Sequence, residues 1–512
     1  MVLRLLSCLL FAAAALAQQP YRSLIIDASE VRGDIRFHTE ATLNPDGVVV
    51  RDYAGYLAAF GDRTPDRVVI PVELGRGRQR PAQQAVPGAN QGPSAAGWPV
   101  FPDESADAQD PASYDFRAVD AVLAAARAAG AAVVVRFDLG STGAGANSLF
   151  ADAARRVALH LNEGWAQGHG FRIKEWLVCD AGAASQGAPQ AMENGNPPAA
   201  VVASAIVQTL QSLDPSSSVG RCFHWRDNSS GPAATLPFLE KRPQGSGLTS
   251  REPGYFSWVF AGAVEDAAEP LRAAERLRKG LDDAGHARIG LRLSTAEFGL
   301  SDAASSASDK IGSDKAGQAA RLAAALVYLQ DAPVRAIALD LWSTPSVARD
   351  EKRQAVLLAA AQLIETPQRL AAEGSDSIGY ALLAGRSADR SSVQILIANA
   401  RQLSTASNTA QPLASSGRSS NSSQPGFEAV RRDDNEGYDL EVANLPWGAA
   451  DFGVYCYRVD GEHALDLIWE GGGRGGSLRL RRQLPAGSVD LVVLEQQDRP
   501  VYDRLPRRRE RR

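Results

Sequence analysis

The stretch from Ile289 to Leu300 reads Ile-Gly-Leu-Arg-Leu-Ser-Thr-Ala-Glu-Phe-Gly-Leu. Its first residues predict a short apolar strand. Glu297 follows the end of that strand, just before Phe298 and Gly299. In parallel α/β barrels the strands end at the face whose loops form the active site. Glu297 is therefore a candidate catalytic nucleophile, provided that the rest of the chain supplies the other strands of such a barrel.

Seven further apolar runs of similar length alternate with helical patterns along the chain. Several of the runs are almost continuously apolar, as is typical of parallel strands covered on both faces. The predicted strands are residues 34–38, 67–73, 132–138, 173–179, 219–225, 254–260, 289–294 and 335–341. Eight strands alternating with helices predict an α/β fold, a (β/α)8 TIM barrel, over residues 33–366.

The pattern changes after Ser377 to short strands of alternating polarity separated by turn residues. This pattern predicts an all-β sandwich domain over residues 374–503, with a mobile loop at 401–437 that is rich in Ser, Asn and Gln. Residues 504–512 form a basic tail. Residues 75–113, a long insertion after the second strand, are expected either to line a cleft or to be disordered.

The chain begins with features of an exported protein. Arg4 precedes an apolar run, and Ala15-Leu16-Ala17 fits a small-residue cleavage site, so residues 1–17 are expected to be a signal peptide. The run is too short to span a membrane. We therefore expect a protein that is secreted or periplasmic and has no membrane span.

Composition and spacing exclude several other classes of function. A net charge of −5 gives no indication of nucleic acid as a partner. The six histidines show no metal-ligand spacing, so we expect no metal and no cofactor. Cys179, Cys222 and Cys456 remain after the signal peptide, and we expect them to be core thiols. The oligomeric state is left open.

Several phrases resemble glycoside hydrolase family 39, which includes β-xylosidases, iduronidases and exopolysaccharide hydrolases. The phrases run through nearly all of the mature chain. They are Phe101-Pro102-Asp103, Tyr114-Asp115-Phe116, residues 155–176, Gly254-Tyr255-Phe256-Ser257-Trp258, Thr295-Ala296-Glu297-Phe298-Gly299 and Leu445-Pro446-Trp447. The resemblance implies a retaining glycosidase fold whose N-terminal strand, within residues 18–32, joins the β-sandwich. The pattern of residues 21–27 independently predicts that pairing.

The sequence departs from the family at four positions that face the sugar. The acid/base glutamate of the family's Asn-Glu-Pro motif corresponds to Ala181, and the asparagine to Asp180. The histidine of the sixth strand corresponds to Val259, and the polar cluster of the second strand to residues 69–72. A retaining glycosidase needs two carboxylates. The resemblance therefore implies that one of the pair is missing.

Three functions remain open at this point. The first is an oligosaccharide- or polysaccharide-binding protein with impaired or lost hydrolysis. The second is an active retaining glycosidase that uses Glu297 and a relocated acid. The third is a secreted structural factor with no sugar in the cleft. Besides the catalytic candidate Glu297, the candidates for binding substrate are Asp180, Tyr255, Trp258, Trp342, Glu73 and Asp138. Of these, Asp180 is also a candidate for a surrogate acid, and Glu73 and Asp138 for a displaced proton donor.

Overall fold

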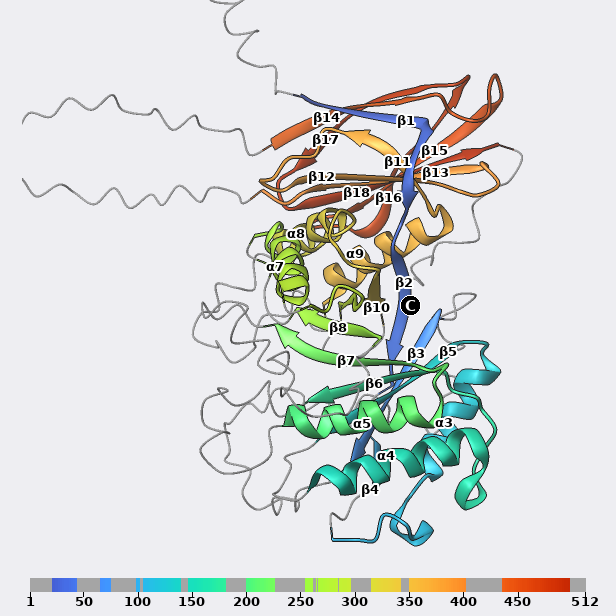
Figure 1. Ribbon diagram of the computed structural model, residues 1–512. Helices are drawn as coiled ribbons and strands as arrows, with labels where there is room; N and C mark the ends of the chain where they lie inside the picture. Colours follow the sequence, from blue (N-terminus) through green and yellow to red (C-terminus); the bar gives the residue numbers. More distant parts are fainter. Residues whose placement is uncertain are drawn as a thin grey trace, which may run out of the picture.

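The computed structural model describes most of the chain and shows two β-sheets with helices around one of them (Figure 1). The described residues are 21–43, 65–74, 98–101, 105–139, 146–180, 199–225, 254–260, 264, 266–283, 285–295, 315–341, 350–401 and 435–497. Trp342, Ala181 and Glu297 lie outside them, as do the predicted helix at 53–60 and most of the segments 75–113 and 401–437.

Eight parallel strands of the described chain close into a barrel, which confirms the predicted fold class. Hydrogen bonding runs in the order β2-β10-β9-β8-β7-β6-β5-β3, and β2 pairs with β3 to complete the ring. The strands are β2 (Phe37–Thr42), β3 (Arg67–Leu74), β5 (Ala132–Leu139), β6 (Glu175–Asp180), β7 (Ser218–Trp225), β8 (Tyr255–Phe260), β9 (Gly290–Ser294) and β10 (Ala336–Asp340). A short strand, β4 (Trp98–Phe101), adds to β3 from within the predicted long insertion.

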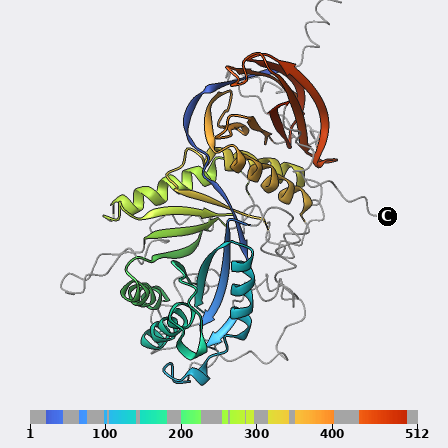
Figure 2. The same cartoon turned by 90° about the vertical axis from the view of Figure 1, so that its right-hand side faces the viewer.

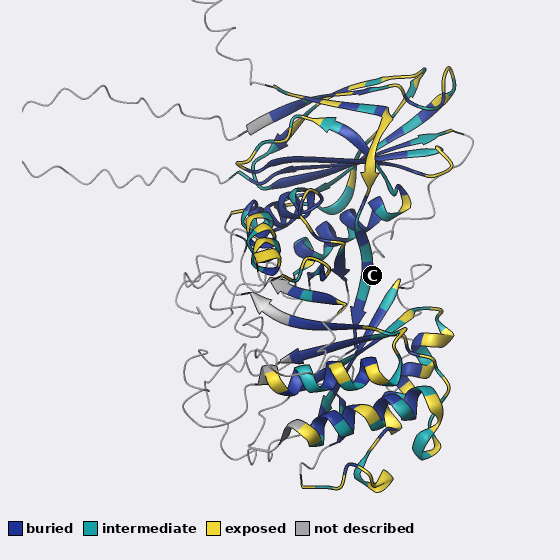
Figure 3. Ribbon diagram, in the orientation of Figure 1, coloured by how far each residue is buried: buried dark blue, intermediate teal, exposed yellow. Residues whose placement is uncertain are grey.

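Helices cover the outer face of the barrel. They are α3 (Arg117–Ala128), α4 (Ala146–Glu163), α5 (Ala199–Leu213), α7 (Glu269–Asp283), α8 (Lys315–Tyr328) and α9 (Glu351–Gln362). In α3 an apolar stripe consists of Val119, Val122, Leu123 and Ala126, all buried. Figure 3 shows the barrel strands buried, with exposed residues on the outer sides of α4 and α5.

The second sheet has nine strands in the described chain, is mostly antiparallel and forms the sandwich. Its strands are β1 (Tyr21–Asp34), β11 (Gln368–Glu373), β12 (Tyr380–Arg386), β13 (Ser392–Asn399), β14 (Asn435–Ala443), β15 (Asp451–Val459), β16 (Ala464–Arg474), β17 (Leu478–Pro485) and β18 (Ser488–Gln496). The N-terminal strand β1 lies inside this sheet, antiparallel to β11 and parallel to β14.

One hydrophobic core joins the barrel to the sandwich. It contains Leu291 of β9, Leu326 of α8, Leu396 of β13 and Leu491 of β18, all buried. Helices α8 and α9 lie between the two sheets (Figures 1 and 2). No helix among the described residues is long and apolar enough to cross a bilayer.

Candidate functional site

Side chains inside the barrel come from alternate residues of each strand, and those at its amino end form an ion-paired floor. Glu175, the first residue of β6, pairs with Arg67 of β3 and with Arg292 of β9. The guanidinium carbon of Arg292 lies 4.1 Å from the ring centroid of Tyr255, the first residue of β8. The floor therefore joins four strands across the barrel by charge and by a cation–π contact.

An apolar group lies in the middle of the barrel. It contains Val69, Val134 and Leu177 together with Cys179 and Cys222, which form a disulfide between the adjacent strands β6 and β7. The two cysteines are directly opposite each other in register, with their Cα atoms 4.8 Å apart. The prediction of core thiols was therefore wrong for this pair. It holds for Cys456, which is buried and free.

Carboxyl groups gather toward the ends of the strands. Asp138 of β5 is buried and accepts two hydrogen bonds of 2.8 Å from the guanidinium of Arg136. Glu73 lies opposite Asp138 in register on β3. The last residue of β10, Asp340, is 1% exposed. We call these carboxyl groups, together with Arg136, the acidic mouth of the barrel.

Glu40 of β2 lies between the floor and the acidic mouth. Burial raises the pKa of Glu40 to about 7, and the carboxylate of Asp340, opposite it in register, adds to the rise. The guanidinium groups of Arg67, Arg292 and Arg136 act in the other direction. Because these charges come from β3, β5, β9 and β10, the Glu40 carboxyl group faces the interior of the barrel.

His38 of β2 shares the interior with Glu40. Burial lowers the pKa of His38 to about 3, and the positive charges of Arg67 and Arg292 lower it further. The imidazole is therefore neutral at pH 7. Its Nε2 atom lies 4.0 Å from the Oε2 atom of Glu40. Of these two titratable groups only Glu40 changes charge near neutral pH, which is where a general acid or base is most effective.

The predicted site residues separate into three groups. Glu73 and Asp138 lie together at the acidic mouth, whereas Tyr255 lies inside the barrel at its floor. Trp258 is 0% exposed and packs on the outer side of the sheet against the helices, so it is a core residue and not a surface on which a sugar could stack.

The remaining predicted residues are not described in full. The backbone of Asp180 ends β6, but its side chain lies outside the described part of the structure. Glu297 and Trp342 lie outside it entirely, as does Ala181. Their roles stay predictions.

Glu40 and Asp340 were missed by the sequence analysis. The first barrel strand was predicted at residues 34–38 and therefore ended before Glu40, whereas β2 runs from Phe37 to Thr42. Alternation of His38 and Glu40 with Phe37, Thr39 and Ala41 was the signal that could have found the correct strand. Asp340 ends a strand that was predicted correctly, and its position at the carboxyl end of that strand was the signal that could have marked it as a candidate site residue.

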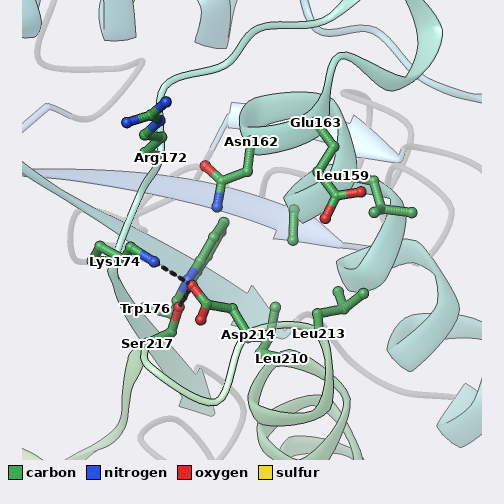
Figure 4. A pocket seen from close by; sticks show the side chains of 11 residues that line it. Leu159, Asn162, Glu163, Arg172, Lys174, Trp176, Leu210, Leu213, Asp214 and Ser217 are labelled. Carbon is green, nitrogen blue, oxygen red and sulfur yellow. Dashed lines mark hydrogen bonds and ion pairs between the residues drawn. The ribbon is translucent and has the colours of Figure 1, made fainter.

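A cavity of about 470 Å³ lies away from the mouth, between α4, α5 and the beginning of β6 (Figure 4). Asn162, Lys174, Trp176 and Asp214 line it, and Lys174 Nζ donates to Asp214 Oδ2 at 2.7 Å. Barrel enzymes place their chemistry at the carboxyl end of the strands. This cavity lies at the amino end of β6, and we assign it no role in the site.

Several of the solved structures that are similar to this chain are glycosidases. A glucosidase from Croceicoccus marinus matches with a TM-score of 0.67 and 23% identity, over 93% of this chain and 99% of that one. The fold is that of a family 39-like glycoside hydrolase. A monomeric beta-xylosidase from Caulobacter crescentus CB15 matches with a TM-score of 0.57 and 13% identity, over 93% of this chain and 100% of that one.

A third structure carries the family's name. The GH39 enzyme from Xanthomonas axonopodis pv. citri matches with a TM-score of 0.57 and 11% identity, over 94% of this chain and 99% of that one. No protein-family model and no curated protein matches the chain. The family 39-like fold predicted from short phrases of sequence is thus confirmed, whereas identities of 11–23% carry no information on activity.

Proposed function

We propose that the protein binds a glycan at the acidic mouth of its barrel and hydrolyses it poorly or not at all. The observation that supports this most strongly is the match of barrel and sandwich together to a glucosidase over 93% of the chain. Hydrolysis is impaired because the acid/base position corresponds by resemblance to Ala181, whose methyl group cannot transfer a proton. General acid catalysis typically contributes ~10²–10⁴-fold to the rate.

The chemistry of the mouth supports a hydroxyl-rich ligand. Carboxylate oxygens are acceptors for sugar hydroxyl groups. Glu73, Asp138 and Asp340 supply such groups from three strands of one barrel. Arg136 holds Asp138 as a carboxylate through two hydrogen bonds, so Asp138 suits hydroxyl binding better than proton donation.

One observation favours a second function, an active retaining glycosidase with a relocated acid. The pKa of Glu40, raised to about 7 by burial, suits a proton donor at neutral pH. In this alternative Glu297 attacks the anomeric carbon and Glu40 protonates the leaving oxygen. The alternative requires the scissile bond to reach into the barrel as far as β2.

Changing Ala181→Glu tests the main proposal. Wild-type protein should bind an oligosaccharide on a glycan array and turn over aryl glucosides and aryl xylosides slowly or not at all. The variant should gain more activity on natural disaccharides than on aryl glycosides, because a poor leaving group needs the proton most. A folded variant without gain on either substrate, or a wild type that binds no glycan, would contradict the proposal.

Changing Glu40→Gln distinguishes the two functions. If the wild type hydrolyses natural disaccharides and this variant loses at least about 100-fold in kcat, Glu40 is the acid and the second function holds. If turnover of natural disaccharides, whose leaving groups need the proton, is unchanged in the variant, Glu40 donates no proton to the leaving group.

We also propose export with removal of residues 1–17, because their composition is that of a signal peptide. N-terminal sequencing of the protein recovered outside the cytoplasm should begin at Gln18. Recovery of a chain that still begins at Met1 would contradict this proposal.

A further inference from the structure

Two histidines and an aspartate meet on the outside of the barrel, on elements other than the strands that carry the acidic mouth. Asp120 lies in the first turn of α3, and His160 in the last turn of α4. His169 lies in the segment that leads from α4 to β6. Their ligand atoms all lie within 4.8 Å of one another.

The hydrogen bonds of His160 define which of its nitrogen atoms faces the aspartate. Its Nδ1 atom lies 2.8 Å from the carbonyl oxygen of Trp165, which can only accept, so Nδ1 carries the hydrogen. In the neutral ring Nε2 is then a bare acceptor, yet it lies 3.1 Å from Oδ1 of Asp120. Two acceptors at this distance require a proton or a metal ion between them.

The second histidine supplies a third possible ligand atom for a metal ion. His169 Nε2 lies 3.3 Å from the same Oδ1 atom of Asp120. Both rings therefore direct a nitrogen atom at one carboxylate oxygen, with the ring centroids 5.8 Å apart. A divalent cation satisfies both rings in their neutral form. Zinc bonds of ~2.0–2.1 Å in tetrahedral geometry place ligand atoms about 3.3 Å apart. The two distances from Asp120 are close to this value, and the three ligand atoms as a set lie within 4.8 Å of one another.

Both rings are held in place before any metal binds. His160 is 2% exposed and stacks on Phe116 at 3.5 Å between ring centroids, and His169 stacks on Phe171 at 4.3 Å. The backbone N–H of His169 donates to the carbonyl oxygen of His160 at 2.7 Å. A Cβ atom on Gly168 would lie 2.1 Å from that same oxygen, so only glycine allows this close approach.

We propose that Asp120, His160 and His169 bind one zinc ion, with a water molecule as the fourth ligand. The Trp165 carbonyl is the outer partner that fixes the tautomer of a metal-binding histidine. The ion ties the segment before β6 to α3. The sequence predicted no metal because the three residues follow no short metal-ligand spacing. The fold brings them together from separate elements.

Zinc binding to the full-length protein without a polyhistidine tag tests the proposal. After removal of metal with a chelator, wild-type protein should bind one equivalent of Zn²⁺ by calorimetry, and Co²⁺ should give the visible absorption of a four-coordinate site. His169→Ala should weaken Zn²⁺ binding at least about 100-fold, since loss of an outer partner alone costs ~10–100-fold.

The control is His463→Ala in the sandwich. His463 also pairs with an aspartate, Asp460, at 2.8 Å, and its side chain is 35% exposed, as is that of His169. This pair has no second histidine ligand among the described residues. Zn²⁺ should raise the Tm of the wild type and of this control but not of His169→Ala. Asp120→Asn provides a second test, should His169→Ala fail to fold.

Two results would overturn the proposal. If the wild type takes up no stoichiometric Zn²⁺, the three residues form a hydrogen-bonded cluster without a metal. If His169→Ala and Asp120→Asn bind Zn²⁺ as tightly as the wild type, the ion binds elsewhere.

Discussion

The floor and the mouth of the barrel are both charged, but their charges are arranged in opposite ways. At the floor one carboxylate, Glu175, contacts two guanidinium groups, those of Arg67 and Arg292. At the mouth three carboxyl groups, those of Glu73, Asp138 and Asp340, come from three strands, and Arg136 pairs with Asp138.

The difference separates stability from function. The floor places opposite charges in contact, so it stabilises the closed barrel. The mouth brings carboxyl groups from three strands into a buried place, and the burial of carboxyl groups costs stability and is typical of a functional site. The raised pKa of Glu40 is one measure of that cost, because this carboxyl group resists ionisation more strongly in the fold than in water.

Loss of the ion pairs at the floor should lower the free energy of unfolding more than any change at the mouth. Glu175→Gln leaves two guanidinium groups facing each other, and burial with the neighbouring Arg292 already lowers the pKa of Arg67. Losing the carboxylate should cost roughly 3–5 kcal/mol of unfolding free energy. Urea denaturation measures this cost. Exposed Glu462→Gln is the control and should stay within about 0.5 kcal/mol of wild type, and equal losses in the two variants would refute a structural floor.

Next to the mouth, the change Glu40→Gln should raise the free energy of unfolding at alkaline pH. A pKa that rises from 4.5 to about 7 on folding means that the native state holds a proton more tightly than the unfolded state. Stability is therefore lost as pH rises from 4.5 to 7, by roughly 3 kcal/mol in total. The amide cannot ionise and avoids this loss.

The measurement is the difference in unfolding free energy between the two proteins at pH 5 and at pH 8. The variant should be stabilised relative to wild type at pH 8 far more than at pH 5. A difference that does not change with pH would show that Glu40 ionises normally.

The smallest effect is expected for Glu297→Gln. If Glu297 belongs with the mouth, its change should leave the Tm unchanged or slightly raised, because carboxylates in functional sites do not supply stability. A structural ion-pair partner would behave as Glu175 does, with a loss of roughly 3–5 kcal/mol. Thermal melts of the two proteins distinguish these outcomes, and glycan affinity of the variant then reports on the site.

The sequence predicted the barrel because its signal is repeated. Each strand is an apolar run and a helical pattern separates it from the next, so errors at single ends did not alter the count of eight. The prediction failed where one residue mattered. Because the first strand was predicted to end at residue 38, Glu40 was not recognised as a barrel residue. Strand alternation directs Trp258, a plausible sugar-stacking residue in its motif, toward the helices.

Contacts between distant segments could not be predicted from spacing. Cys179 and Cys222 become neighbours only because β6 and β7 are adjacent and in register. Asp120 and His160, which are 40 positions apart in the sequence, meet only because the fold brings α3 close to α4. Such pairs depend on the register of strands and the packing of helices, which one sequence does not specify.

The position of β1 within the second sheet also affects the order in which the chain can fold during synthesis. Arg22 donates a hydrogen bond to the carbonyl of Gly374, which is synthesised 352 residues later. At a synthesis rate of ~5–20 residues per second, about 20–70 s pass between the synthesis of β1 and that of its neighbour β11, and more before β14 is made. Leu24 and Ile26, fully buried at the end, have no sheet to join during this interval. The first strand of the chain is therefore among the last to fold, and a chaperone that binds apolar extended segments would find its target at the beginning of the chain.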